Sequence, residues 1–167
     1  MKQLHRRVVV TGLGILSPIG NNLRDAWHSC IEGNSGITRV DIGLPNNPVT
    51  VGGRLKNFDP VEFLDPKEVR RIDPFIQYGV IAANQSIEHS GILDSNIDLT
   101  RVGVNFGAGI GGIATIEKNK TLLSEKGFKK VSPFFVPGSI VNMISGLVSM
   151  KHGFMGPNTS VVTACST

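Results

Sequence analysis

The sequence predicts a single α/β domain, and three observations support that prediction. Of its 167 residues, 40% are hydrophobic and 18% are charged, a composition typical of folded globular chains and unlike disordered or fibrous ones. A strand pattern, a glycine-containing turn and a helical pattern follow one another twice, over residues 8–33 and 101–123. A chain of this length buries enough surface for one core but hardly for two. We therefore expect one domain, or part of one, over residues 1–167, with an irregular insertion at about 34–60.

The first strand–turn–helix pattern lies near the start of the chain. Three valines at 8–10 run into Gly12, which predicts a buried central strand followed by a tight turn. A helix ending at Gly33 is predicted by apolar residues spaced three and four apart, namely Leu23, Ala26, Trp27, Cys30 and Ile31. Cys30 is expected to be a small core residue on that face. Residues 34–60 are rich in Gly, Pro, Asn and Asp and carry little periodicity, which predicts an irregular surface segment.

The later elements follow from proline, glycine and apolar spacing. Asp73 and Pro74 open a helix whose broad apolar face continues to Gly91. The remaining predicted elements are short helices opened by Asp59-Pro60 and Asp65-Pro66, a strand over 101–106, a glycine turn over 107–112, a helix over 113–123, a helix within 131–150 and a strand over 160–163. The last strand runs directly into Ala164, Cys165 and Ser166, where a helix should begin.

The glycine turn at 107–112 reads GAGIGG and matches the G-x-G-x-x-G fingerprint of dinucleotide sites. Such a site also needs an acidic residue at the end of the next strand, about twenty residues on. The candidate, Glu125, lies in a charged run with no strand before it. A structural glycine turn is favoured, and a nucleotide-binding oxidoreductase domain is the alternative.

Cys165 is the candidate nucleophile. It follows a strand between the small residues Ala164 and Ser166, an arrangement that lets a nucleophile stand on a sharp turn at the mouth of a parallel sheet. An inert buried thiol is the alternative. A cysteine nucleophile needs a neighbouring base or cation, and no motif surrounds any of the histidines, which are His5, His28, His89 and His152.

Two groups of cations indicate a partner. Lys67, Arg70 and Arg71 would share one helix face, and Lys126, Lys129 and Lys130 form a second group. The net charge is only +4, and Phe128 is the single aromatic residue within either group, so an acidic protein partner is favoured over nucleic acid. An ordinary solvated surface is the alternative.

Cysteine usage and apolar stretches bear on location. The two cysteines form no CxxC pair and no Cys/His cluster, which predicts neither a zinc site nor a disulfide framework and favours the reducing cytoplasm. The basic start is followed by an apolar stretch that Gly12, Gly14 and Pro18 interrupt, unlike an export signal. Residues 131–150 are uncharged, but their prolines and serines argue against a membrane span.

Five blocks of the sequence resemble one enzyme family. They are RRVVVTGLGILSPIGN, RIDPFIQYGVIAANQSIEHSGI, GAGIGG, SPFFVPGSIVNMISG and GPNTSVVTACST. Together they are similar to the elongating β-ketoacyl-[acyl-carrier-protein] synthases of bacterial type II fatty-acid synthesis, over nearly the whole chain. The resemblance implies a thiolase-like fold of layered helices on a mixed sheet, usually as a homodimer, with no cofactor and no metal.

The resemblance also implies roles for individual residues. Cys165 would take the acyl chain as a thioester, with its own backbone N–H contributing to the oxyanion hole. Ile110 would gate the acyl pocket, and Phe135 would line the pocket of the neighbouring subunit. A basic patch for acyl carrier protein, which carries acyl or malonyl groups, would consist of Lys67, Arg70, Arg71, Lys129 and Lys130.

The match is to the first part of such a synthase. In the family, two catalytic histidines, a lysine and a Gly-Phe-Gly segment lie beyond the nucleophile. We therefore expect a truncated N-terminal half that forms no product alone, because decarboxylation of the malonyl group and its Claisen condensation with the acyl thioester need those groups. The alternative from another class is a non-catalytic folded fragment that only binds a partner.

Overall fold

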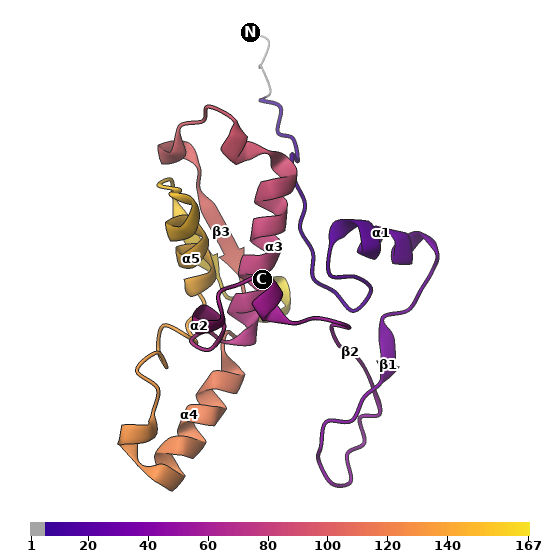
Figure 1. Cartoon of the computed structure of the whole chain (residues 1–167), viewed down its shortest axis with the longest axis vertical. Helices are drawn as coiled ribbons and strands as arrows, with labels where there is room; N and C mark the ends of the chain where they lie inside the picture. The colour runs from indigo at the N-terminus through magenta and orange to yellow at the C-terminus, as the bar shows by residue number, and fades with distance from the viewer. Residues whose placement is uncertain (1–5) are drawn as a thin grey trace.

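The computed structural model describes residues 6–167 and contains a helix-covered core with two projecting parts (Figure 1). Its helices and strands are α1 (Leu23–Ile31), β1 (Ile37–Arg39), β2 (Val51–Gly53), α2 (Pro66–Val69), α3 (Pro74–Ser90), β3 (Val104–Gly107), α4 (Ile113–Lys126), α5 (Met143–His152) and β4 (Asn158–Val161). Five single-turn 3-10 helices connect them, η1 (Pro60–Glu62), η2 (Ile92–Asp94), η3 (Leu99–Arg101), η4 (Phe128–Lys130) and η5 (Ala164–Ser166). In Figure 1, α1 and the β1–β2 hairpin lie to one side of the core, and α4 projects below it.

The four strands form two separate pairs. β3 and β4 are parallel, with Val104 opposite Asn158 and Gly107 opposite Val161. β1 and β2 are antiparallel and form a hairpin inside residues 34–60, where the composition predicts an irregular segment. The α/β prediction is confirmed, and the mixed strand directions are divided between two two-stranded sheets.

The core lies where α3 and α5 cover the β3–β4 pair. Ile76, Val80 and Ile81 of α3 are almost completely buried against Ile144 and Val148 of α5. These positions repeat at helical spacing on both helices, so their burial joins α3 and α5 in one apolar core. The predicted boundaries of α3 are confirmed, because Asp73 caps its first turn and Gly91 ends it in the left-handed conformation, at φ 61°.

The valines at 8–10 do not form the predicted buried strand. Val8 is 92% exposed, and residues 6–16 are in no strand of the described structure. Their chain instead runs along α3, where the Leu13 N–H donates to Nδ1 of His89 and the Ile15 N–H donates to Oε1 of Gln85. Gly14 allows this close approach, because a Cβ there would collide with the carbonyl oxygen of Ala82. The prediction of a buried strand is wrong because no strand of the described residues pairs with residues 8–10.

The apolar face of α1 is only partly covered. The helix forms as predicted, but Ala26 is its only buried residue, and Trp27 is 64% exposed. Cys30 is exposed, so its predicted place in the core is wrong. The periodicity correctly identifies one face of the helix, but no layer of the described residues packs over that face.

Two further helices differ from their predicted bounds. α4 continues to Lys126 and ends before Gly127, at φ 77°, so the charged run around Glu125 belongs to the helix. α5 begins only at Met143, and residues 138–142 approach it as irregular chain. None of the described helices combines the length and the apolar character that crossing a membrane requires.

Candidate functional site

Cys165 lies on a sharp turn directly after β4. The turn is η5, and the residue before the cysteine, Ala164, has φ 51°. A left-handed conformation is uncommon for a residue with a Cβ and stores backbone strain of about 1 kcal/mol or more. The thiol is exposed. The strained turn therefore presents Cys165 at the end of the strand, as the sequence predicts for a nucleophile.

The glycine turn at 107–112 lies beside the cysteine turn. Because β3 and β4 are parallel and in register at Gly107 and Val161, the turns that follow them leave the same edge of the sheet. A Cβ on Gly107 would collide with the side chain of Thr167, and one on Gly109 would lie 3.4 Å from the carbonyl oxygen of Ala164. The absence of a Cβ is therefore used at Gly107, whereas a Cβ at Gly109 would only touch the cysteine turn.

Ile110 projects from the centre of the glycine turn and is 70% exposed. The turn is anchored on its far side, where the Gly112 N–H donates to the carbonyl oxygen of Ser139 over 2.9 Å. The Ser139 hydroxyl in turn donates to the carbonyl oxygen of Phe135 over 2.8 Å. The structure thus links the segments that carry Ile110 and Phe135 through two hydrogen bonds, and the Phe135 side chain is half-buried.

The backbone N–H groups around the thiol are only partly used by hydrogen bonds of the turn. The N–H groups of Ser166 and Thr167 donate within the turn, to the carbonyl oxygens of Thr163 and Ala164. Among the backbone hydrogen bonds of the described residues, none uses the N–H of Cys165. A free N–H beside an exposed thiol is the arrangement needed to bind an oxyanion formed by attack of that thiol.

No histidine in the described part of the chain contacts Cys165. His28 is exposed on α1, His89 accepts from Leu13, and Nε2 of His152 lies 2.9 Å from Oδ1 of Asn84. Burial, and secondarily the neighbouring Lys151, lower the pKa of His152 below its usual value. His5 lies outside the described residues. Among the described residues, Cys165 is therefore an exposed thiol with no histidine beside it.

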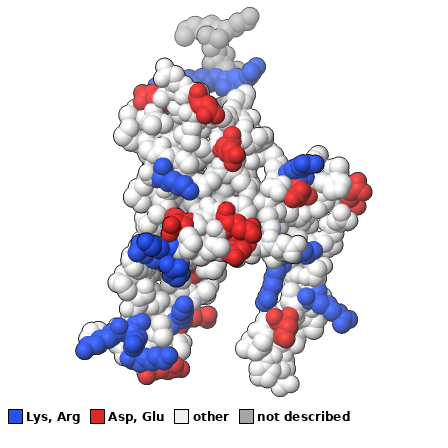
Figure 2. Space-filling model, in the orientation of Figure 1, with Lys and Arg blue, Asp and Glu red and all other residues white. Residues whose placement is uncertain are grey.

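The predicted cations are exposed and form two groups. α2 has only four residues, so Lys67 lies in it, Arg70 caps it and Arg71 follows it, with the Arg71 guanidinium 4.5 Å from the centre of the Phe134 ring. Lys129 and Lys130 form the exposed η4 turn. Figure 2 shows one blue group beside α2 and another at the lower end of α4, each with acidic side chains next to it.

The nucleotide-site alternative lacks the residue it requires. The GAGIGG turn does stand between a strand and a helix, and Gly111 has φ 88°. Glu125, however, is an exposed residue of α4 and does not follow a strand. The glycines are explained by their close approach to residues 139 and 164–167, which is a structural function.

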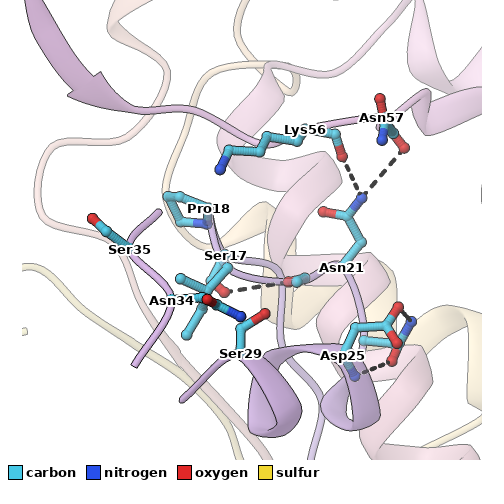
Figure 3. A pocket seen from close by; sticks show the side chains of 12 residues that line it. Ser17, Pro18, Asn21, Asp25, Ser29, Asn34, Ser35, Lys56 and Asn57 are labelled. Atoms are coloured by element: carbon cyan, nitrogen blue, oxygen red, sulfur yellow. Dashed lines mark hydrogen bonds between the residues drawn. The ribbon is translucent and has the colours of Figure 1, made fainter. Parts of the chain in front are cut away.

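A polar hollow of about 420 Å³ lies away from these residues (Figure 3). It is formed where α1 begins, and sequence reasoning singled out none of its residues as functional. Nδ2 of Asn21 donates to the carbonyl oxygens of Lys56 (2.8 Å) and Asn57 (3.3 Å), which joins the chain before α1 to the chain after β2.

Across residues 6–167, no group of three His, Cys, Asp or Glu side chains has the geometry to hold a metal ion.

Residues 5–167 match the family model described as Beta-ketoacyl synthase, N-terminal domain. The chain belongs to the β-ketoacyl synthase family. It is 46% identical over 165 residues to 3-oxoacyl-[acyl-carrier-protein] synthase 2 of Coxiella burnetii (strain RSA 493 / Nine Mile phase I), a match that covers 97% of this chain and 39% of that protein. It is 45% identical over 163 residues to the protein of the same name from Vibrio harveyi, again over 97% and 39%.

Solved structures agree with this family assignment. The ketosynthase/chain length factor named for ishigamide superposes with a TM-score of 0.81 at 18% identity, over 95% of this chain and 40% of that one, which supports the fold alone. A ketosynthase complex described as AntDE:AntF, a type II PKS acyl-carrier protein with its ketosynthase bound to the hexaketide, matches with a TM-score of 0.72 at 26% identity, over 87% and 40%. The chain thus spans about 40% of the length of the β-ketoacyl synthase relatives it matches.

Proposed function

We propose that this chain forms the nucleophile-bearing part of a β-ketoacyl-[acyl-carrier-protein] synthase, in which Cys165 receives the acyl chain. The complete enzyme is called the full-length synthase below. The observation that carries the proposal is the strained turn at Ala164, which presents the exposed Cys165 thiol beside the glycine turn with Ile110. The family match over residues 5–167 supports the same reaction class.

The first step is transfer of an acyl group between two sulfur atoms. The Cys165 thiolate attacks the carbonyl carbon of the acyl thioester on the carrier protein, and the N–H of Cys165 stabilises the resulting oxyanion. The new C–S bond to Cys165 remains, the C–S bond to the carrier breaks, and the carrier thiolate leaves and takes up a proton. In the second step, malonyl carrier protein loses carbon dioxide, and its carbanion attacks the acyl-Cys165 carbonyl, which yields the 3-oxoacyl thioester and frees the cysteine.

Ile110 and Phe135 are proposed to shape the acyl pocket. Ile110 lies on the turn next to Cys165 and is open to solvent, so it can meet an acyl chain attached to the thiol. Phe135 is connected to that turn through Ser139, and its side chain is proposed to line the acyl pocket of the neighbouring subunit. Homodimer formation is supported by β4, an edge strand of the described sheet whose last residue, Val161, is exposed, as is Val162 after it.

Acyl carrier protein, with its acyl or malonyl cargo, is the proposed partner of the two cation groups. Lys67, Arg70 and Arg71 near α2, and Lys129 and Lys130 in η4, offer positive charge that an acidic protein surface can meet. One solved relative is a ketosynthase in complex with an acyl-carrier protein, which supports this class of partner.

The two unpaired cysteines favour a reducing location such as the cytoplasm.

Competition between the two exposed cysteines tests the proposal. The chain is incubated with decanoyl carrier protein or with a small decanoyl thioester, and acylation at each cysteine is measured by peptide mass spectrometry. We expect the ratio of Cys165 to Cys30 acylation to be roughly tenfold higher with the carrier-linked substrate, because docking raises its local concentration beside Cys165. Cys30→Ala should leave acylation of Cys165 unchanged, whereas Cys165→Ala should abolish the preference.

Equal ratios with both substrates would contradict the proposal and favour a chain that only binds a partner. The same sample with malonyl carrier protein added should form no 3-oxoacyl product, because no histidine of the described chain contacts Cys165 to stabilise the carbanion. Formation of that product by the chain alone would show that the groups needed for decarboxylation are already present in it.

A further inference from the structure

Helix α4 connects the two parts of the site that the proposed function assigns to different tasks. The turn with Ile110 leads directly into its first residue, and the η4 turn with Lys129 and Lys130 follows its last. Figure 1 shows α4 projecting from the core, with η4 at its far end. The direction of α4 therefore sets where the docking cations lie relative to the acyl gate.

Apolar burial does not fix that direction. Asn119 is the only buried residue of α4, and it is 5% exposed. Ile113 and Ile116, which begin the helix, are 52% and 46% exposed. Among the helices and strands, α4 packs chiefly against η4, the turn that follows it in the chain. A helix without an apolar anchor is held by its specific polar contacts.

The first such contact is made by Asp73, which caps two helices at once. Its Oδ1 accepts from the N–H of Phe75 in α3 (3.2 Å), and its Oδ2 accepts from the N–H of Thr115 in α4 (2.9 Å). Gly112, at the N-cap position of α4, has no side chain with which to cap it. Asp73 is 5% exposed, so its carboxylate is held between the positive ends of two helix dipoles.

The second contact is made by Asn119 in the middle of α4. Its Nδ2 donates to the carbonyl oxygen of Thr115 (2.9 Å), and its Oδ1 accepts from the N–H of Ser132 (3.0 Å). Ser132 lies two residues after Lys130, so this bond ties the chain leaving the η4 turn back to the helix. Both polar ends of Asn119 are used, as burial of an amide requires.

We propose that Asp73 and Asn119 are positioning residues, which fix α4 to the core and the η4 turn to α4, and thereby hold the docking cations at a set place relative to the Ile110 turn. Thr115 joins the two, since its N–H bonds to Asp73 and its carbonyl oxygen bonds to Asn119. Neither side chain touches the reacting atoms. The functional consequence rests on the proposed docking of acyl carrier protein, whereas the structural part can be measured without it.

Amide hydrogen exchange tests the structural part on the 167-residue chain. Asn119→Leu keeps the size of the side chain and removes both hydrogen bonds, and we expect exchange in residues 127–132 to become about tenfold faster while exchange in β3 and β4 is unchanged. Asn119→Asp keeps the acceptor for Ser132 and should restore slow exchange at that residue. Thr121→Leu makes the same kind of change at an exposed position of α4 and is the control.

Asp73→Asn keeps one acceptor oxygen for two donors, so the Thr115 or Phe75 amide should exchange about tenfold faster. Asp98→Asn, at the exposed cap of η3, is its control. Unchanged exchange at these positions in Asn119→Leu and Asp73→Asn would overturn the proposal. Equal acceleration throughout the chain would also overturn it, because the residues would then serve stability alone.

Binding of acyl carrier protein separates this inference from the proposed function. Asn119→Leu should raise the dissociation constant several-fold with an unchanged salt dependence, since every charge is retained. Lys129→Glu/Lys130→Glu should both raise the constant and reduce the salt dependence. Normal binding by Asn119→Leu alongside loss in the charge-reversal variant would overturn the positioning role and leave the docking proposal standing. Unaffected binding in both would contradict the docking proposal, while the exchange rates would still decide the positioning role.

Discussion

The core and the α4 arm are built on opposite principles. In the core, α3 and α5 bury apolar side chains such as Ile76 and Val148 over the β3–β4 pair. In the arm, which comprises α4 and η4, the only buried residue is polar and the apolar side chains are largely exposed. Apolar burial tolerates many orientations, whereas a hydrogen bond specifies one. The comparison indicates that the core provides stability and the arm provides placement, and the following predictions test that difference.

Truncation of a buried isoleucine should show the largest effect. Ile76→Ala leaves a cavity at a site that is 0% exposed, so we expect the free energy of unfolding to fall by about 3 kcal/mol, measured by urea denaturation. Ile113→Ala, at a 52% exposed position of the arm, should change it by less than about 0.5 kcal/mol. Similar losses in both variants would show that the arm contributes to the same core.

Two glycines inside helices of the core should respond in opposite directions to alanine. A Cβ at Gly79 would lie 2.7 Å from Cγ2 of Ile144, so Gly79→Ala should destabilise the chain by about 2 kcal/mol. Gly146 has nothing within 4 Å of such a Cβ, so Gly146→Ala should stabilise α5 by up to about 1 kcal/mol. Thermal unfolding of the two variants gives the signs, and stabilisation of both would show that helix propensity, not packing, dominates in the core.

Charge reversal in the arm should affect binding more than stability. Lys129→Glu/Lys130→Glu should raise the dissociation constant for acyl carrier protein about tenfold at low salt, measured by calorimetry, and less at high salt. Arg39→Glu/Arg54→Glu makes the same change in net charge at exposed positions on and beside the hairpin. If both pairs weaken binding equally, the partner responds to net charge and not to the arm.

The smallest expected effect is a pH dependence at the end of α5. Burial lowers the folded-state pKa of His152 below the 6.5 of its unfolded form, so the unfolded chain binds more protons as the pH falls below that value. Stability should therefore decrease slightly from pH 7 downward until the folded pKa is passed. The measurement is the midpoint of urea unfolding between pH 7 and 5. His152→Gln should remove this decrease of the midpoint with falling pH, whereas His28→Gln, at an exposed position, should retain it.

The sequence was sufficient where local chemistry decides the structure. Asp73 and Pro74 mark the start of α3, through a side-chain cap and a fixed φ, and the left-handed Gly91 marks its end. Each of these effects acts within one helical turn. It was insufficient for residues 8–10, because a valine run specifies a strand only when a neighbouring strand is available. The prediction that Cys30 is buried was wrong for a similar reason, since periodicity identifies a helix face but not what packs against that face.

The site shows the same division. The strand-end position of Cys165 and the family resemblance predict a nucleophile there, and the structure places the residue on a strained turn after the strand. The approach of the Gly107 turn to Thr167 depends on sheet register, which no local pattern contains. The bonds of Asp73 to Thr115 and of Asn119 to Ser132 join residues 42 and 13 positions apart, and short-range spacing gives no signal for them.

The exposed valines at 8–10 also matter for protein quality control. An uncovered run of β-branched residues is the kind of segment that holdase chaperones bind and that seeds intermolecular β-pairing at high concentration. Arg6 and Arg7 directly precede the run, and charged residues in that place act as gatekeepers, because stacking copies of the segment would bring their guanidinium groups together. The two arginine charges therefore oppose in-register stacking of copies of this segment.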